Sequence, residues 1–124
     1  MAEKFSDKVL IIDDDSRNIF ALKAVLRSKG FTCLTALSAG DGLKHLADHQ
    51  DIGIVLLDMM MPEMDGYEAI GQIHDLKPSL PVVAVTAQAM VGDKEKCLEA
   101  GATGYVAKPI NVDELMVLLN RFLK

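Results

Sequence analysis

The sequence predicts an α/β fold in which helices cover both faces of a parallel sheet. Short apolar runs alternate with longer amphipathic stretches along the 124 residues. The runs are continuously apolar and several are rich in Val and Ile, which is typical of strands that are buried on both faces. Five such strand–helix units, joined by right-handed crossovers, form an open, doubly wound sheet.

The apolar runs are the predicted strands. Residues 9–12, 54–57 and 82–85 carry only apolar side chains. Residues 31–37 and 104–107 also contain polar residues or glycine, so these two runs are less pure. Each run is short, and the longer stretches between the runs are therefore the predicted helices.

Capping residues mark the first two amphipathic stretches as helices. Asp15 or Ser16 can accept hydrogen bonds from the first amides of a helix that ends at Gly30. Ser38 can cap the next helix in the same way. The apolar side chains that these two helices carry include Ile19, Leu22, Leu26, Leu43, Leu46 and Ala47.

Three further helices complete the pattern. Asp65 precedes the third, and the fourth covers about residues 90–100 and ends at Gly101. In the last helix, Asn111 and Glu114 have the spacing of a capping box, although Asn replaces the usual Ser or Thr. The apolar residues at helical spacing in the third and fifth helices are Tyr67, Ile70, Ile73, Leu115, Leu118, Leu119 and Phe122.

Charge and composition narrow the classes of function. The net charge is −5, so the chain has no general attraction to phosphate backbones, and we expect no direct binding to nucleic acid. Cys33 and Cys97 form no CxxC pair and are expected to be small buried side chains in a reducing compartment. Residues 1–8 lack the apolar stretch of a signal peptide, and no apolar run approaches the roughly 20 residues that span a bilayer. We therefore expect a single domain over residues 1–124 that lies in the cytoplasm and does not associate with a membrane.

Polar side chains stand where the predicted strands end. In open α/β sheets, ligands bind outside the carboxyl ends of the strands, so these side chains are expected to share one site. Three carboxylates that converge there repel one another, and one lysine offsets only part of that cost. A hard divalent cation such as Mg²⁺ suits these oxygen ligands, together with water and phosphate oxygens. The polar residues at the strand ends are Asp13, Asp14, Asp15, Asp58, Thr86 and Lys108.

Each of these residues alone also has a purely structural explanation. The acidic run after the first strand is an ordinary strand exit, and Asp15 in it is an expected helix cap. Thr86 suits a strand because it is β-branched, and Lys108 is ordinarily a solvated surface residue. Pro109 after Lys108 can form a cis bond that directs the lysine. The joint pattern is more specific than any single member.

Four segments together resemble the receiver domain of response regulators, over essentially the whole chain. They are VLIIDDD (9–15), VLLDMMMPEMDG (55–66), VVAVTA (82–87) and GATGYVAKPI (101–110). The resemblance implies a flavodoxin-like fold with strand order 2-1-3-4-5. The DDDSRNIFAL and AMVGDKEKCLEAG segments look like the receiver modules of hybrid histidine kinases, and single-domain regulators of the chemotaxis type share much of this.

The resemblance also implies a role for individual residues. Asp58 matches the phosphoacceptor, while Thr86 and Lys108 match the residues that contact phosphoryl oxygens. Tyr105 matches an aromatic residue that changes its exposure when Thr86 moves. The residues that match the Mg²⁺ ligands are Asp13, Asp14, Asp58 and Met60, the last through its backbone carbonyl.

The implied function is a phosphorylation switch in a two-component phosphorelay, and not an enzyme that acts on a separate substrate. Its expected phosphodonor is a histidine kinase or a histidine phosphotransfer protein. Phosphorylation is expected to change the face formed by the fourth helix, the fifth strand and the fifth helix, which a downstream protein target reads. We expect a monomer before phosphorylation.

Three alternatives remain open at this stage. In phosphatases of the haloacid dehalogenase class, Asp13 and Asp15 would stand for the DxDx[TV] motif, but Arg17 occupies the position of Thr or Val. A flavodoxin-type carrier needs a hydroxyl-rich phosphate loop after the first strand, where this chain has three carboxylates. A degenerate receiver that serves only as an interaction module is the third, and the presence of every acceptor-site position argues against it.

Overall fold

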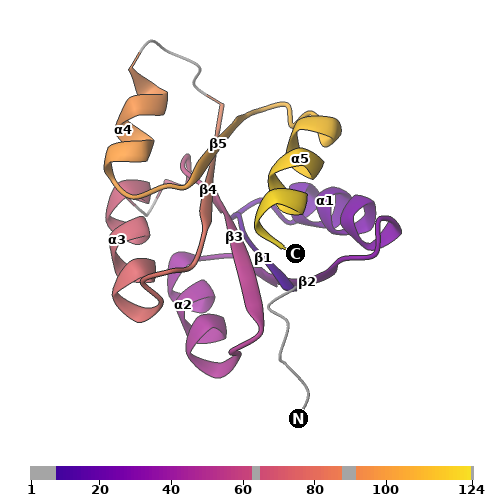
Figure 1. Cartoon of the computed structure of the whole chain (residues 1–124), viewed down its shortest axis with the longest axis horizontal. Coiled ribbons are helices and arrows are strands. Elements are labelled where there is room, and N and C mark those ends of the chain that lie inside the picture. Colours follow the sequence, from indigo (N-terminus) through magenta and orange to yellow (C-terminus); the bar gives the residue numbers. More distant parts are fainter. Residues whose placement is uncertain (1–7, 63–64, 88–91, 124) are drawn as a thin grey trace.

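The computed structural model of the chain describes residues 8–62, 65–87 and 92–123. Five parallel strands among these residues form a single sheet in the order β2-β1-β3-β4-β5, alternating along the chain with helices (Figure 1). The strands are β1 (Lys8–Ile12), β2 (Thr32–Ala36), β3 (Ile52–Asp58), β4 (Val82–Thr86) and β5 (Gly104–Ala107). The helices are α1 (Ser16–Ser28), α2 (Ala39–Asp48), α3 (Gly66–Leu76), α4 (Asp93–Glu99) and α5 (Val112–Phe122). The predicted fold class and strand order are confirmed.

Two apolar layers hold the sheet between the helices. Helices α1 and α5 cover one face, and α2, α3 and α4 cover the other (Figure 1). Alternate residues of β1 contribute to opposite layers: Leu10 and Ile12 pack on the side of α2 and α3, whereas Val9 and Ile11 pack on the side of α1 and α5. Because every residue of β3 is buried, its continuous apolar run is explained by coverage on both faces.

Side-chain caps start four of the helices, as the sequence predicts. Asp15 accepts a hydrogen bond from the Arg17 amide, and Ser38 accepts one from the Asp41 amide. Asp65 and Asn111 cap α3 and α5 in the same way, each through a side-chain oxygen. In α2, Leu46 is buried and Leu43 packs against the same core, whereas Ala47 is exposed.

Helix α4 starts differently. Its N-cap is Gly92, which has a φ of +91° and makes no side-chain cap bond. Such a backbone conformation is one that glycine adopts without cost. The described part of α4 begins at Asp93, and the first residues of the predicted helix, 90 and 91, lie outside the described residues.

Two other predictions concern cysteines and membranes. Cys33 and Cys97 are both buried free thiols, as expected. In the part of the chain that the structure describes, none of the helices combines the length and the apolar character needed to cross a bilayer.

Candidate functional site

The strand register brings the polar strand ends to one edge of the sheet. Ile12 of β1 is paired with Leu57 of β3, so Asp13 and Asp58, which follow them, stand side by side. Thr86 of β4 is paired with Ala107 of β5, which places the backbone of Lys108 next to Thr86. The Lys108 amide donates to the Thr86 carbonyl at 2.7 Å. Residues far apart in the sequence are thus held together by the sheet itself.

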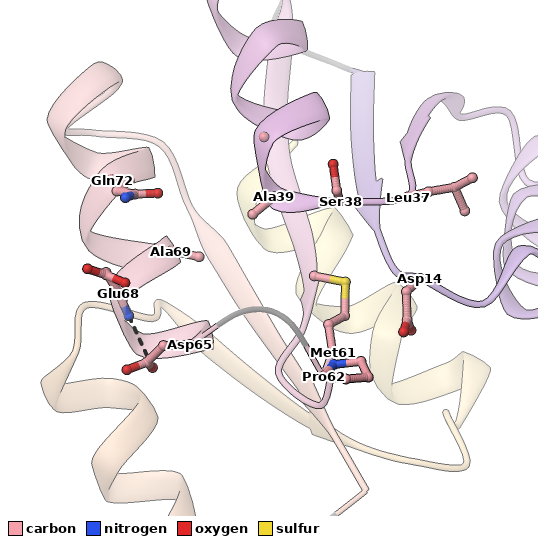
Figure 2. Close-up of a pocket in the computed structure, with 11 residues that line it drawn as sticks. Asp14, Leu37, Ser38, Ala39, Met61, Pro62, Asp65, Glu68, Ala69 and Gln72 are labelled. Carbon is pink, nitrogen blue, oxygen red and sulfur yellow. Dashed lines mark hydrogen bonds between the residues drawn. The ribbon is translucent and has the colours of Figure 1, made fainter.

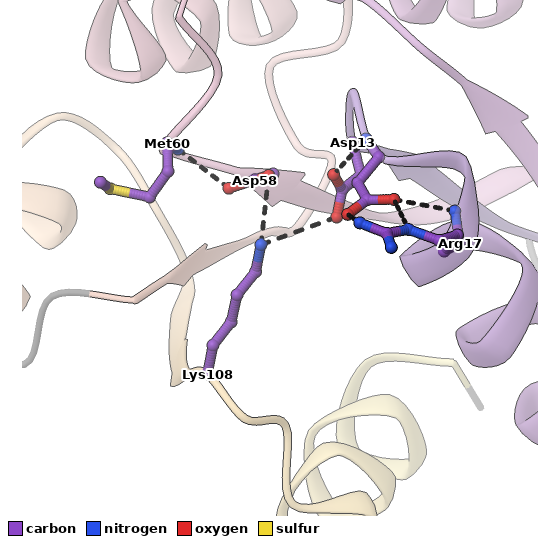
Figure 3. A network of polar contacts seen from close by, with 6 residues as sticks. Asp13, Arg17, Asp58, Met60 and Lys108 are labelled. Carbon is purple, nitrogen blue, oxygen red and sulfur yellow. Dashed lines mark hydrogen bonds and ion pairs between the residues drawn. The ribbon is translucent and has the colours of Figure 1, made fainter.

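Asp58 is buried at this edge with both of its carboxylate oxygens engaged. Only 4% of its surface is exposed. Its Oδ1 accepts a hydrogen bond from the Met60 amide at 2.9 Å, and its Oδ2 accepts one from Lys108 Nζ at 3.2 Å (Figure 3). These contacts fix the orientation of the carboxylate.

Asp13 is the second buried carboxylate. Its Oδ1 accepts a hydrogen bond from the Asp15 amide at 2.9 Å, and its Oδ2 lies 3.8 Å from Lys108 Nζ. Burial raises the pKa of Asp13, and the neighbouring Asp58 carboxylate raises it further, while the Asp15 amide and Lys108 act in the opposite direction. A single ammonium group therefore does not balance the two buried carboxylates.

Asp14 completes a cluster that is able to bind a metal ion. One carboxylate oxygen from each of Asp13, Asp14 and Asp58 lies within 4.8 Å of the others. Asp14 is exposed whereas the other two are buried, so the cluster opens to solvent on one side. Hard oxygen donors with access to water suit a small divalent cation, and such an ion would offset the repulsion that Lys108 leaves.

A pocket of about 510 Å³ adjoins the exposed side of this cluster (Figure 2). Asp14 lies at one end of it, and the start of α2 at Ser38 and the side chains of Glu68 and Gln72 on α3 line its walls. Asp65, also in the lining, is engaged in capping α3 through the amides of Tyr67 and Glu68. The pocket gives water access to Asp14, which an ion that retains part of its hydration shell requires.

Thr86 and Lys108 flank the acidic cluster from β4 and the end of β5. Thr86 is buried, with 2% of its surface exposed, at the last position of β4. The peptide bond between Lys108 and Pro109 is cis, as the sequence allowed. Met60, two residues after Asp58, has 43% of its surface exposed, and its amide donates to Asp58.

Asp15 and Arg17 stand beside the cluster and are not part of it. Asp15 caps α1 and pairs with Arg17, whose Nε lies 3.3 Å from Asp15 Oδ1 (Figure 3). The pair is exposed, so its contribution to stability is small. The third carboxylate of the acidic run is therefore a helix cap, as its position after the strand predicts.

Tyr105 lies away from the acidic cluster, near the start of β5. In the sheet register it is paired with Ala84, two residues before Thr86. Its hydroxyl donates to Asp93 Oδ2 at 3.0 Å, and the hydroxyl of Tyr67 donates to Asp93 Oδ1 at 3.3 Å. Asp93 could not be identified from the sequence, because its partners are 26 and 12 residues away along the chain and no motif joins them.

Comparisons with known proteins agree with this geometry. The family model described as response regulator receiver domain matches residues 9–120. The sensor histidine kinase RcsC of Salmonella typhi is 41% identical over 107 residues, which make up 86% of this chain and 11% of that protein. The chain thus spans only a small part of the length of the curated relatives it matches.

Solved structures show the same arrangement of strands and helices. A CheY-like receiver domain protein from Methanospirillum hungatei has a TM-score of 0.84 at 30% identity, with 93% of this chain and 91% of that chain covered. The BeF3-activated receiver domain of DrrB has a TM-score of 0.80 at 32% identity, with 94% and 96% covered.

Proposed function

This chain belongs to the response regulator receiver domain family, the phosphoacceptor modules of two-component signalling, and from that premise we propose that Asp58 is its phosphoacceptor. The observation that carries the proposal is the position of the Asp58 carboxylate, which lies 3.2 Å from Lys108 Nζ and within the acidic cluster of Asp13 and Asp14. Membership of the family decides against the phosphatase and flavodoxin alternatives.

The chemistry suits these groups. A carboxylate oxygen of Asp58 forms a bond to phosphorus while the bond between phosphorus and the donor atom breaks, and the donor leaves with that electron pair. The product is an acyl phosphate. Lys108, which already contacts Asp58, is placed to stabilise the negative charge on a phosphoryl oxygen, since its ammonium group is held at the same edge.

We propose Mg²⁺ as the cation of the acidic cluster. Asp13, Asp14 and Asp58 would hold it through carboxylate oxygens, and Met60 through its backbone carbonyl. When bound, the ion neutralises charge on the phosphoryl oxygens. Asp13 and Asp58 contribute by presenting carboxylate oxygens that the strand ends hold in place.

Thr86 and Tyr105 would couple phosphorylation to a conformational change. The Thr86 hydroxyl would donate to a phosphoryl oxygen, a bond that exists only in the phosphorylated state and so favours one conformation. Tyr105 would then move into the space that Thr86 leaves, and the face formed by α4, β5 and α5 would change. A downstream protein target would recognise that face.

The proposed phosphodonor is a histidine kinase or a histidine phosphotransfer protein. The relative RcsC, named as a sensor histidine kinase, supports this class of partner. The net charge of −5 argues against direct binding to nucleic acid. We place the protein in the cytoplasm, where the free thiols of Cys33 and Cys97 stay reduced, and expect a monomer before phosphorylation.

Intact mass spectrometry tests the assignment of Asp58. The native protein and Asp58→Asn are incubated with acetyl phosphate, with and without Mg²⁺. We expect one added phosphoryl group on the native protein in the presence of Mg²⁺, and none on Asp58→Asn. Addition to both proteins would show that another residue is the acceptor. If neither is modified, binding of beryllofluoride with Mg²⁺ separates a receiver that requires its kinase from a degenerate one.

A further inference from the structure

A single carboxylate joins three elements on the face of the sheet that carries α4. Asp93, the first residue of α4, accepts hydrogen bonds from two tyrosines through its two oxygens. Tyr105 of β5 donates to Oδ2 at 3.0 Å, and Tyr67 of α3 donates to Oδ1 at 3.3 Å. Hydrogen bonds to an ionised acceptor are stronger than those between neutral groups. Asp93 therefore ties the start of α4 to both of its neighbours.

The two partners of Asp93 differ in how firmly they are held. Tyr67 stands in the first turn of α3, which is capped by Asp65 and buries Ala69, Ile70 and Ile73. Tyr67 is thus part of a well-anchored element. Tyr105 is half-buried in β5, and it is the residue whose movement the proposed switch requires.

Helix α4 has few other anchors among its described residues. It starts at Gly92 without a side-chain cap bond, and Cys97 is its one buried side chain. Leu98 is 41% exposed. Since apolar burial supplies most of the stability of a helix in a folded domain, the hydrogen bonds to Asp93 matter more here than they would in α3.

The phenol of Tyr105 remains a hydrogen-bond donor under ordinary conditions. Burial, followed by the bond to Asp93, raises the pKa of Tyr105 to about 12. At neutral pH the hydroxyl is therefore protonated and can donate to the Asp93 carboxylate.

We propose that Asp93 is a positioning residue that holds Tyr105 in the arrangement seen here and so opposes the phosphorylation switch. This inference rests on the role of Tyr105 in the proposed function. Movement of Tyr105 toward Thr86 must break its bond to Asp93, whereas Tyr67 stays fixed on α3. The start of α4 then loses one of its two ties, which links the position of the Tyr105 ring to the position of the helix.

The sign of the effect follows from linkage between conformations. A contact present in only one of two states favours that state, and a ligand that binds the other state must work against it. Removing the contact therefore strengthens the binding of a phosphoryl mimic. Because one hydrogen bond is removed, we expect an increase in apparent affinity of about three- to tenfold.

The test is an NMR titration of the full chain with beryllofluoride at saturating Mg²⁺. Asp93→Ala should bind about three- to tenfold more tightly than the native protein. Asp93→Asn, which keeps the size of the side chain, should change the affinity in the same direction and by less. Glu95→Ala is the matched control: Glu95 lies exposed in the same turn of α4, so the substitution removes the same charge and should leave the affinity within about twofold of native.

A second arm asks whether Asp93 acts through Tyr105. In a Tyr105→Phe background the effect of Asp93→Ala should disappear, because the hydroxyl that Asp93 holds is already gone. A merely structural role for Asp93 would lower stability without this dependence on Tyr105.

The outcomes separate the two proposals. If the native protein does not bind beryllofluoride with Mg²⁺, the proposed function fails, and the role of Asp93 falls with it. If the native protein binds but Asp93→Ala binds equally or more weakly, only the inference about Asp93 is overturned. A gain in affinity that persists in the Tyr105→Phe background also overturns it.

Discussion

The acidic edge of the sheet and helix α4 are held in place by different means. At the edge, Asp13 follows β1 and Asp58 ends β3, two strands with a paired neighbour on each side, and both residues are more than nine-tenths buried. Helix α4 starts at an uncapped glycine and buries only Cys97 among its described residues. The side chains of the proposed phosphorylation site thus stand at the ends of buried central strands, whereas the helix proposed to respond has few buried side chains. Few buried contacts and weak local anchoring are the properties of segments that open at low free-energy cost.

The first prediction removes the positive charge from the acidic edge of the sheet. Lys108→Ala should slow phosphorylation of the protein by acetyl phosphate about a hundredfold or more, because it removes the ammonium group that contacts Asp58. The rate is measured by intact mass over time at saturating Mg²⁺. Lys44→Ala on the surface of α2 is the control and should leave the rate unchanged. A rate for Lys108→Ala within a few-fold of native would remove Lys108 from the proposed chemistry.

A second effect concerns the charge balance of the same edge. In the presence of a chelator at pH 7, Asp13→Asn should raise the free energy of unfolding by on the order of 1 kcal/mol, because a buried carboxylate beside Asp58 becomes neutral. Urea unfolding of the native protein and of Asp13→Asn measures this difference in the free energy of unfolding.

The pH dependence has a defined sign. Since the pKa of Asp13 is raised in the folded protein, its ionisation destabilises the fold as pH rises through that folded pKa, and the cost is absent below the ordinary value of 3.8. The advantage of Asp13→Asn should therefore shrink as the pH is lowered toward 4. Saturating Mg²⁺ should favour the native protein instead, since Asp13 is a proposed ligand. An advantage of Asp13→Asn that is independent of pH would contradict this charge balance.

The last prediction compares the same substitution at the N-cap of α4 and inside α3. Gly92→Ala should lower the free energy of unfolding by about 1 kcal/mol, because alanine is strained at a φ of +91°. Gly71→Ala in α3 should raise it by about 0.5–1 kcal/mol, because Gly71 is helical and an added Cβ meets no atom within 4 Å. Equal signs in urea unfolding would show that the start of α4 is not held as the structure has it.

The sequence allowed the acidic edge to be predicted and did not allow Asp93 to be found. The site residues all follow or end apolar runs, and parallel strands bring such positions to one edge of the sheet however the helices pack. These residues are Asp13, Asp14, Asp58, Thr86 and Lys108. The helix caps could be predicted as well, because a capping residue and its helix are neighbours in the chain.

Contacts between side chains of different helices and strands could not be predicted from the sequence in this way. The hydrogen bonds from Tyr67 and Tyr105 to Asp93 depend on how α3, α4 and β5 pack. In the sequence, Asp93 is an ordinary acidic residue at the start of a helix. Ala47 illustrates the same limit, since helical periodicity places it near the apolar stripe but packing leaves it exposed.

Hydrogen–deuterium exchange tests the contrast between the two regions most directly. Peptides that cover β1, β3, β5, α3 and α4 are followed in the native protein with Mg²⁺, before and after addition of beryllofluoride. We expect α4 to exchange faster than α3 beforehand, and beryllofluoride to change exchange in α4 and β5 while the interiors of β1 and β3 stay protected throughout. Protection in α4 equal to that in α3, with no change when beryllofluoride binds, would contradict this expectation.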